Sequence, residues 1–203
     1  MHGGVVVDAD GRRFADETVG YSEFAALLAA RPGARGWVVL DERIDALSQA
    51  FGDYRDVAGS GALRWADDAE ELAARLGVAP EVLAGELADA AAVARGEQAA
   101  DRVGRTAVEA PLTPPLAAVE IVPALFHTQG GLHVDEHARL LDAADRPVAG
   151  VYASGGAAVG MSGHGAAGYL AGNGLLPALG LAVLAADHLA GVRPAPALQE
   201  VLP

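Results

Sequence analysis

VYASGGAAVGMSGHGAAGYLAGNGL, residues 151–175, has the pattern of a short buried β-strand, a glycine-rich loop and the start of an apolar helix. Eight glycines lie between residues 155 and 174, and glycine permits positive φ and close backbone approach. A helix that follows such a loop presents backbone N–H groups and a partial positive charge to a ligand. No Gly-Lys-Ser/Thr sequence is present, so this is not a Walker-type phosphate loop. The pattern predicts either a ligand-contacting unit or a loop that is simply tightly packed.

The segments on either side of this loop predict a mixed organisation. An apolar helix is expected over residues 175–190, and short strands over 132–134 and 139–141. Before residue 116 the expected elements are a hairpin over 3–14, a strand over 36–40 and helices over 22–30, 67–76 and 80–95. Ser22 is the expected N-cap of the first of these helices. We therefore expect an α+β domain over residues 1–115 and a return segment over residues 116–203.

Composition excludes several classes of function. The 203 residues include 27 acidic side chains and 14 basic ones, all of them arginine, for a net charge of −13. This balance disfavours nucleic acid and anionic membrane surfaces as partners, since a polyanion is met by clustered cations. With no lysine and no cysteine, the chain supplies no Schiff base, disulfide or thiolate metal site. No apolar leader or membrane span is apparent, and we expect a cytoplasmic protein.

Five short sequences occur in an order that is typical of one superfamily. They are GGVVVDADGRRFADE at 3–17, DRVGR at 101–105, HTQGGL at 127–132, PVAGVYASG at 147–155 and GNG at 172–174. This series resembles the C-terminal part of FAD-dependent oxidoreductases of the fumarate reductase/succinate dehydrogenase flavoprotein and 3-ketosteroid dehydrogenase superfamily. The resemblance implies a substrate-cap domain followed by the C-terminal strand–Gly-loop–helix portion of an α/β Rossmann-like FAD-binding domain.

The resemblance also implies a cofactor and a missing part. FAD is the expected cofactor, and the expected contacts to it are Gly155, Gly156, Gly172, Asn173, Gly174 and Leu175. The N-terminal nucleotide-binding half of the family is absent from this sequence. We therefore expect a second chain, or a missing N-terminal half, to supply the Rossmann unit.

Departures from the family's pattern narrow the class of substrate that we expect. Fumarate reductases place arginines shortly after the Phe-x-x-Glu run and just before the Gly-Asn, whereas this sequence has Tyr21 and Tyr169 in those neighbourhoods. Without these arginines, a small dicarboxylate lacks its bidentate partners. Tyr21 matches the position of a catalytic tyrosine in ketosteroid dehydrogenases, and Tyr169 matches another one residue out of register. The resemblance thus implies that tyrosine handles a proton next to a hydride transfer, on an apolar or neutral carbonyl substrate.

Other readings stay open at this point. His127 matches a histidine that contacts substrate in the reductases, which keeps an unsaturated-carboxylate (fumarate-like) reductase as an alternative. The structural alternative for His127 is a loop histidine that hydrogen-bonds only within its own loop. The chain could also be a non-catalytic accessory fragment that binds a partner supplying the Rossmann half. Glycines separate His127 from His133 and His137, so no metal site is expected. The acidic pairs Asp16-Glu17 and Asp67-Asp68 are expected to be helix-entry or solvated charges.

Overall fold

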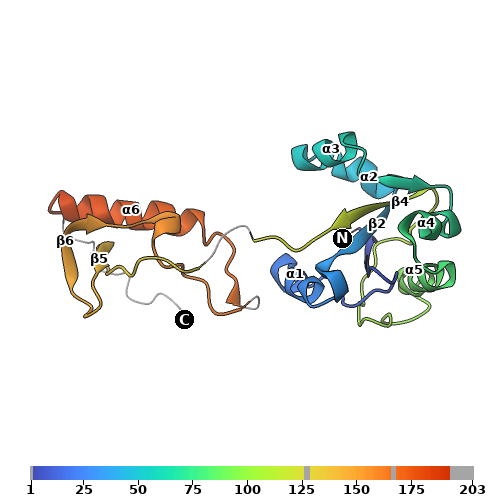
Figure 1. Cartoon of the computed structure of the whole chain (residues 1–203), viewed down its shortest axis with the longest axis horizontal. Helices are drawn as coiled ribbons and strands as arrows, with labels where there is room; N and C mark the ends of the chain where they lie inside the picture. Colours follow the sequence, from blue (N-terminus) through green and yellow to red (C-terminus); the bar gives the residue numbers. More distant parts are fainter. Residues whose placement is uncertain (1, 126–128, 166–167, 193–203) are drawn as a thin grey trace. The chain divides into compact units, whose positions relative to one another are not determined.

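The computed structural model describes residues 2–125, 129–165 and 168–192, and the chain divides into two compact units, residues 1–124 and 125–203. The first unit is built on a four-stranded antiparallel sheet with the strand order β1-β2-β4-β3 (Figure 1). Its strands are β1 (Val5–Asp8), β2 (Gly36–Asp41), β3 (Arg64–Ala66) and β4 (Leu116–Ile121). Its helices are α1 (Tyr21–Ala29), the 3₁₀ turn η1 (Pro32–Ala34), α2 (Glu42–Ser48), α3 (Gly52–Gly59), α4 (Ala69–Leu76) and α5 (Pro80–Ala94).

The core of this unit lies between one face of the sheet and helices α4 and α5. Strand register explains which side chains meet there: Val5 pairs with Val39 and Val7 with Trp37, so all four point to the same face. This face packs on residues of α4 and α5, which contribute Leu72, Ala73, Leu83 and Ala90 to the same buried cluster. β4 lies beyond the expected domain boundary at residue 115, but it pairs with β2 and β3 and therefore belongs to the first unit.

Local sequence signals account for most element ends in the first unit. Asp8 accepts hydrogen bonds from the backbone N–H groups of Asp10 and Arg12, which closes the turn after β1. Asp68 caps α4 by accepting from the Glu71 N–H, and Gly77 ends this helix in the left-handed conformation. Pro80 opens α5, where its missing N–H costs nothing. The helix-entry role expected for the Asp67-Asp68 pair is thus confirmed for Asp68.

Two details of the sequence-based expectations were wrong. The first helix begins at Tyr21 with Gly20 in the N-cap position and no side-chain cap, so Ser22 lies inside the helix instead of capping it. The helix begins there because the Phe24 N–H already bonds to the Gly20 carbonyl. Glu17, expected to be a solvated or helix-entry charge, is buried instead, because it is enclosed by arginines from both ends of the unit.

The second unit is a two-stranded hairpin followed by the glycine-rich loop and one long helix. The hairpin pairs β5 (Arg139–Leu141) with β6 (Pro147–Tyr152), and the helix α6 spans Leu175–Leu189 (Figure 1). Residues 132–134 form isolated bridges to Ala158 and Leu140. The expectation of a buried strand at 151–153 was wrong for Val151, which is 39% exposed because, within the described residues, β6 pairs only with β5. None of the described helices is long and apolar enough to cross a membrane.

Candidate functional site

The first half of the glycine-rich loop is held against the segment that precedes the hairpin. The 3₁₀ turn η2 (Gly155–Ala157) leads into Ala158. The Leu132 N–H donates to the Ala157 carbonyl at 2.8 Å, and the Leu132 carbonyl accepts from the Val159 N–H at 2.9 Å. A Cβ atom on Gly131 would lie 2.4 Å from the Ala158 carbonyl, so no larger residue fits without a backbone shift. Gly131 thus marks a point where two backbone segments are in direct contact.

The second half of the loop closes on itself through two glycines. The Gly163 N–H donates to the Gly168 carbonyl at 2.7 Å, and a Cβ on Gly168 would stand 2.4 Å from the Gly163 carbonyl carbon. Because the two backbones lie so close, packing alone is enough to require glycine at these two positions. The structure therefore supports a structural role for part of the glycine-rich composition.

Asn173 fastens the end of the loop. The residue is buried, and its side-chain Nδ2 donates to Ser162 Oγ at 2.6 Å. The same hydroxyl accepts from the Leu170 N–H at 3.1 Å, and the Asn173 N–H bonds to the Leu170 carbonyl at 3.2 Å. Ser162 therefore joins the middle of the loop to the residues that lead into α6, a role that its place in the sequence did not reveal.

The start of α6 is open on its outer side. Gly174 stands at the N-cap without a side-chain cap, and Gly172 has a φ of +84° that favours glycine. A Cβ on either residue would meet no atom within 4 Å, so the backbone here borders open space. By contrast, a Cβ on Gly155 would lie 3.2 Å from Ala178 Cβ, which places η2 against the first turns of α6. Leu175 is 84% exposed beside this opening.

The predicted catalytic residues lie in different parts of the chain. Tyr21 is the first residue of α1 in the first unit and is 68% exposed. Tyr169 lies in the second unit, between the closed loop and Asn173, and is partly buried. His127 lies outside the described residues. The assignments of these three residues stay predictions.

A buried charge cluster in the first unit was not anticipated. Arg13 donates to both carboxylate oxygens of Glu17 at 2.7 Å, and its Nη1 stands 2.7 Å from Asp101 Oδ2. Arg105 Nη1 lies 3.2 Å from Glu17 Oε2 and also donates to the Gly4 carbonyl at 2.8 Å. Burial opposes the positive charge of Arg13, but the carboxylates of Glu17 and Asp101 outweigh it and raise the pKa of Arg13. The four charged residues come from the sequences RRFADE at 12–17 and DRVGR at 101–105. These two sequences lie far apart in the chain, so nothing in either one predicts that they meet.

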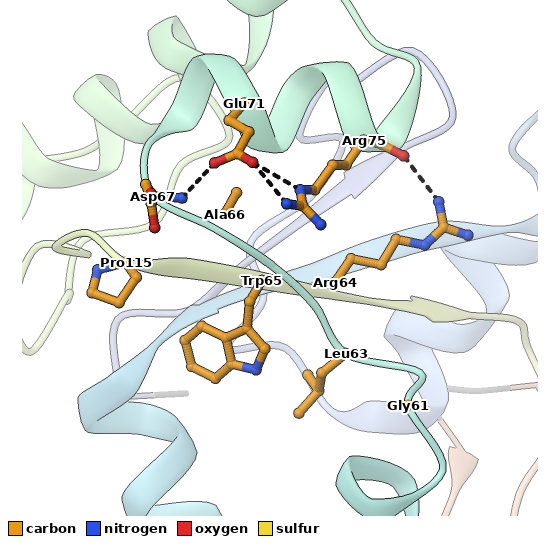
Figure 2. Close-up of a pocket in the computed structure, with 9 residues that line it drawn as sticks. All are labelled: Gly61, Leu63, Arg64, Trp65, Ala66, Asp67, Glu71, Arg75 and Pro115. Carbon is orange, nitrogen blue, oxygen red and sulfur yellow. Dashed lines mark hydrogen bonds and ion pairs between the residues drawn. The ribbon is translucent and has the colours of Figure 1, made fainter.

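A hollow lies at the β3 edge of the sheet. It has a volume of about 660 Å³ and is lined in part by Arg64, Trp65, Glu71 and Arg75 (Figure 2). None of the predicted site residues lines it. Glu71 already accepts hydrogen bonds from Arg75 and from the Asp67 N–H, drawn as dashed lines in Figure 2. Arg75 Nη2 lies 2.7 Å from Glu71 Oε1, and the Asp67 nitrogen lies 2.8 Å from Glu71 Oε2. No residue of the glycine-rich loop lines this hollow, and both oxygens of its Glu71 carboxylate already accept hydrogen bonds.

Comparison with known proteins identifies the family. A family model described as "FAD binding domain" matches residues 1–175. The chain belongs to this FAD-binding family. As the sequence resemblance implied, its neighbours include fumarate reductases and ketosteroid dehydrogenases, and FAD is the cofactor of the family.

Three relatives of this FAD-binding chain are informative. The 4-oxocyclohexanecarboxylate 2-dehydrogenase of Sinomonas cyclohexanicum is 33% identical over 211 residues, covering 84% of this chain and 36% of that protein. The open conformation of a flavocytochrome c3 fumarate reductase superposes with a TM-score of 0.70 at 27% identity, covering 94% of this chain and 33% of the other. The 3-ketosteroid delta1-dehydrogenase of Sterolibacterium denitrificans gives 0.70 at 26% identity, covering 93% and 39%. The chain spans between 16% and 36% of the length of six curated relatives.

The residues at the start of α6 fit part of an FAD molecule. A flavin's polar edge needs hydrogen-bond donors, and the uncapped N-terminus of α6 offers backbone N–H groups and the positive end of the helix dipole. Open space at Gly172 and Gly174 leaves room for close approach. Asn173, by contrast, uses its amide within the loop, so its expected contact with FAD stays a prediction.

Proposed function

We propose that this chain is the cap and C-terminal part of an FAD-dependent oxidoreductase that acts on a C–C bond next to a carbonyl. The substrate is an apolar or neutral ketone, and the enzyme works in the cytoplasm. The observation that carries the proposal is the position of Tyr21, which is the exposed first residue of α1. Residues 18–21 include no arginine, the residue that fumarate reductases place in this neighbourhood. The relative with the highest identity among those above is named as a 4-oxocyclohexanecarboxylate 2-dehydrogenase, and the cyclic ketone in this name supports the choice of a ketone, although that substrate also carries a carboxylate.

The proposed roles divide between the two units. When it is bound, FAD supplies the hydride chemistry. Tyr21 takes or returns the proton on the neighbouring carbon from its position at the first residue of α1. Tyr169 assists at the same proton. Backbone N–H groups of residues 172–174 stabilise negative charge on the flavin edge or on the substrate carbonyl.

The partner in this proposal is a chain or segment that carries the nucleotide-binding Rossmann unit. The outer surface of α6 supports it, because Leu175, Leu176 and Leu179 are all more than half exposed. In the described residues only Pro177 of this helix is buried. A stripe of this kind is typical of a surface that packs against another element. Without that element the chain should bind FAD weakly, since most cofactor contacts are lost.

The proposal is tested by purifying the full chain together with a chain that supplies a Rossmann unit, and measuring flavin absorbance and turnover. We expect stoichiometric FAD only in the complex, and dehydrogenation of a cyclic ketone such as cyclohexanone with an artificial electron acceptor. Stoichiometric FAD on the isolated chain would contradict the partner requirement. A flavin-loaded complex that ignores cyclic ketones would contradict the substrate class.

A second candidate is an unsaturated-carboxylate reductase in which His127 contacts the substrate. The fold similarity to a fumarate reductase, at 27% identity over 94% of this chain, favours keeping it. The same flavin-loaded complex distinguishes the two, because this candidate predicts that fumarate oxidises a reduced dye and that cyclohexanone does not react. His127→Ala should then lower turnover by about tenfold or more. A complex without turnover of either substrate would indicate the non-catalytic accessory fragment.

A further inference from the structure

The start of helix α1 has a negatively charged side chain folded over it. A Cβ atom built on Gly20 would overlap Glu23 Oε2 and would lie 3.3 Å from Glu23 Oε1. The Gly20 backbone has a φ of −55° and a ψ of 147°, which most residues can adopt, so its conformation does not require glycine. What glycine provides here is room for the Glu23 carboxylate, which therefore lies against the residue that directly precedes Tyr21.

No neighbouring side chain neutralises this carboxylate. Among residues 2–125, neither Glu23 oxygen has an ion-pair or hydrogen-bond partner. The sequence from Phe14 to Ala30 contains no basic residue. Arg31, the first cation after α1, stands beyond the opposite end of the helix and pairs with Asp8 at 2.6 Å. The negative charge of Glu23 is therefore unopposed at the end of α1 that carries Tyr21.

The backbone at this helix start would otherwise favour anions. Helix α1 has no side-chain cap, and the N–H groups of a first turn and the positive end of a helix dipole attract negative charge. Glu23 is the acidic residue of that first turn and supplies a carboxylate of its own there. A second carboxylate that approaches Tyr21 thus meets a like charge.

We propose that Glu23 selects substrates by charge, so that neutral ketones reach Tyr21 and ketones with a carboxylate are disfavoured. The inference rests on the proposed function, in which Tyr21 exchanges the substrate proton. A neutral substrate is little affected by the Glu23 charge. A substrate carboxylate about one side-chain length away is disfavoured by about fivefold at low salt. Glu23 is thus a specificity-determining residue, separate from the proton-transfer chemistry.

The test compares two ketones of nearly the same shape on the flavin-loaded complex: 4-oxocyclohexanecarboxylate and its neutral carboxamide. The readout is the ratio of their kcat/KM values, because a loss of folded protein lowers both values alike. Glu23→Gln should raise the carboxylate-to-carboxamide ratio by about fivefold, and Glu23→Lys should raise it by about fivefold again. The gain should shrink as sodium chloride increases from about 20 to about 300 mM, since salt screens exposed charges.

Glu42→Gln is the matched control for the loss of one charge. Glu42 is an exposed acid in the first turn of α2, which Figure 1 shows in another part of the first unit. The ratio of the two kcat/KM values should therefore stay at that of the parent. A graded change from glutamate to glutamine to lysine, absent in the control, is a response to charge and not to a general loosening of the unit.

A second measurement needs no flavin. It follows amide NMR shifts of the isotope-labelled full chain on addition of sodium acetate or of neutral acetamide. Acetate should shift the Ser22 and Phe24 N–H signals several-fold more in Glu23→Gln than in the parent, because the repelling charge is gone. Acetamide should shift these signals equally in the two proteins.

The two measurements separate this inference from the proposed function. If the complex turns over the carboxamide but Glu23→Gln keeps the parent's ratio, Glu23 does not select by charge. Equal acetate shifts in the parent and in Glu23→Gln would overturn the inference as well. If the complex turns over neither ketone, the proposed function is contradicted and the role of Glu23 in specificity falls with it, whatever the acetate shifts show.

Discussion

Arg13 and Glu17 form a bidentate ion pair inside the first unit, with Nε to Oε1 and Nη2 to Oε2 both at 2.7 Å and both side chains buried. Glu17 also accepts from the Val6 N–H at 3.0 Å, which ties the pair to strand β1. Asp101 and Arg105 complete the cluster from the segment after α5. The segment after β1 and the segment after α5 are thus joined by four buried charged side chains, and each of them depends on the others for an oppositely charged partner.

Glu17→Gln should destabilise the first unit strongly. Removing one partner leaves Arg13 and Arg105 buried without their shared carboxylate, which costs about 3–5 kcal/mol in comparable buried pairs. Both tryptophans, Trp37 and Trp65, lie in the first unit, so their fluorescence during urea unfolding reports on it alone. Glu97→Gln, in the exposed pair with Arg95, should leave the midpoint nearly unchanged. Equal midpoints for the two variants would show that the buried cluster adds little to stability.

Acid should loosen the hairpin of the second unit through Asp135. Burial raises the pKa of Asp135, but hydrogen bonds from the Arg139 side chain and from the Arg139 and His137 N–H groups outweigh burial and lower it. A lowered pKa means that the folded state favours the ionised form. The resulting stabilisation is present above the ordinary aspartate pKa of about 3.9 and is lost as the pH falls through the lower folded value.

Amide hydrogen exchange at His137 and Arg139 measures this loss. In the parent chain, protection should fall steeply below about pH 4, whereas Asp135→Asn should remove most of that pH dependence and lower protection at neutral pH. Asp145→Asn is the control, since Asp145 is exposed and asparagine tolerates its positive φ of 56°. Identical pH profiles for the parent and Asp135→Asn would refute the role of Asp135.

The elements that the sequence predicted are those with local signals, and those it missed depend on distant partners. Helix α4 has its own cap and stop at Asp68 and Gly77, and α5 has Pro80. Strand β3 has only three residues and exists because it pairs with β4, about fifty residues later in the chain. Helices α2 and α3 have 7 and 8 residues, too short for a clear periodic pattern.

The candidate site shows the same division. The loop and the helix start were evident from glycine spacing and apolar content, because both are properties of one continuous segment. Burial of Glu17 was not, because it depends on Arg105, 88 residues away. The link from Ser162 to Asn173 was missed for a related reason: a serine in a glycine-rich loop has no pattern that predicts its partner.

Ser162→Ala should loosen the approach to α6. The change removes the oxygen that accepts from Asn173 Nδ2 and the Leu170 N–H, and leaves a buried amide unsatisfied at a cost of about 1–3 kcal/mol. Hydrogen exchange at Leu170 should accelerate accordingly, and the flavin-loaded complex should release FAD faster. Ser60→Ala, at an exposed position of the first unit, is the control. Unaltered exchange at Leu170 would mean that the loop keeps its shape without this hydroxyl.

Leu179→Glu should abolish assembly with the chain that we propose supplies the Rossmann unit. Leu179 is 70% exposed on α6, so the isolated chain should remain folded, with a change of about 0.5 kcal/mol or less. In the complex, a buried carboxylate without a partner is unfavourable. Size-exclusion chromatography with flavin absorbance gives the readout, and Val57→Glu on α3 is the control for added charge on an apolar surface residue. Persistence of the flavin-loaded complex with Leu179→Glu would exclude this face of α6 from the interface.

Tyr21→Phe should slow the chemical step of the flavin-loaded complex by about a hundredfold or more, because it removes the group that we propose exchanges the substrate proton. Folding should survive, since Tyr21 is exposed and only its hydroxyl is lost. Tyr54→Phe is the matched control in the same unit: the Tyr54 hydroxyl donates to Asp45 at 2.7 Å and has no proposed part in the reaction. Turnover of a cyclic ketone as a function of pH is the decisive measurement, since the loss of a proton-transfer group should also remove the alkaline limb of the profile. If Tyr21→Phe keeps the parent's rate and pH profile, Tyr21 is not the proton-transfer residue, and His127 is the next residue to substitute.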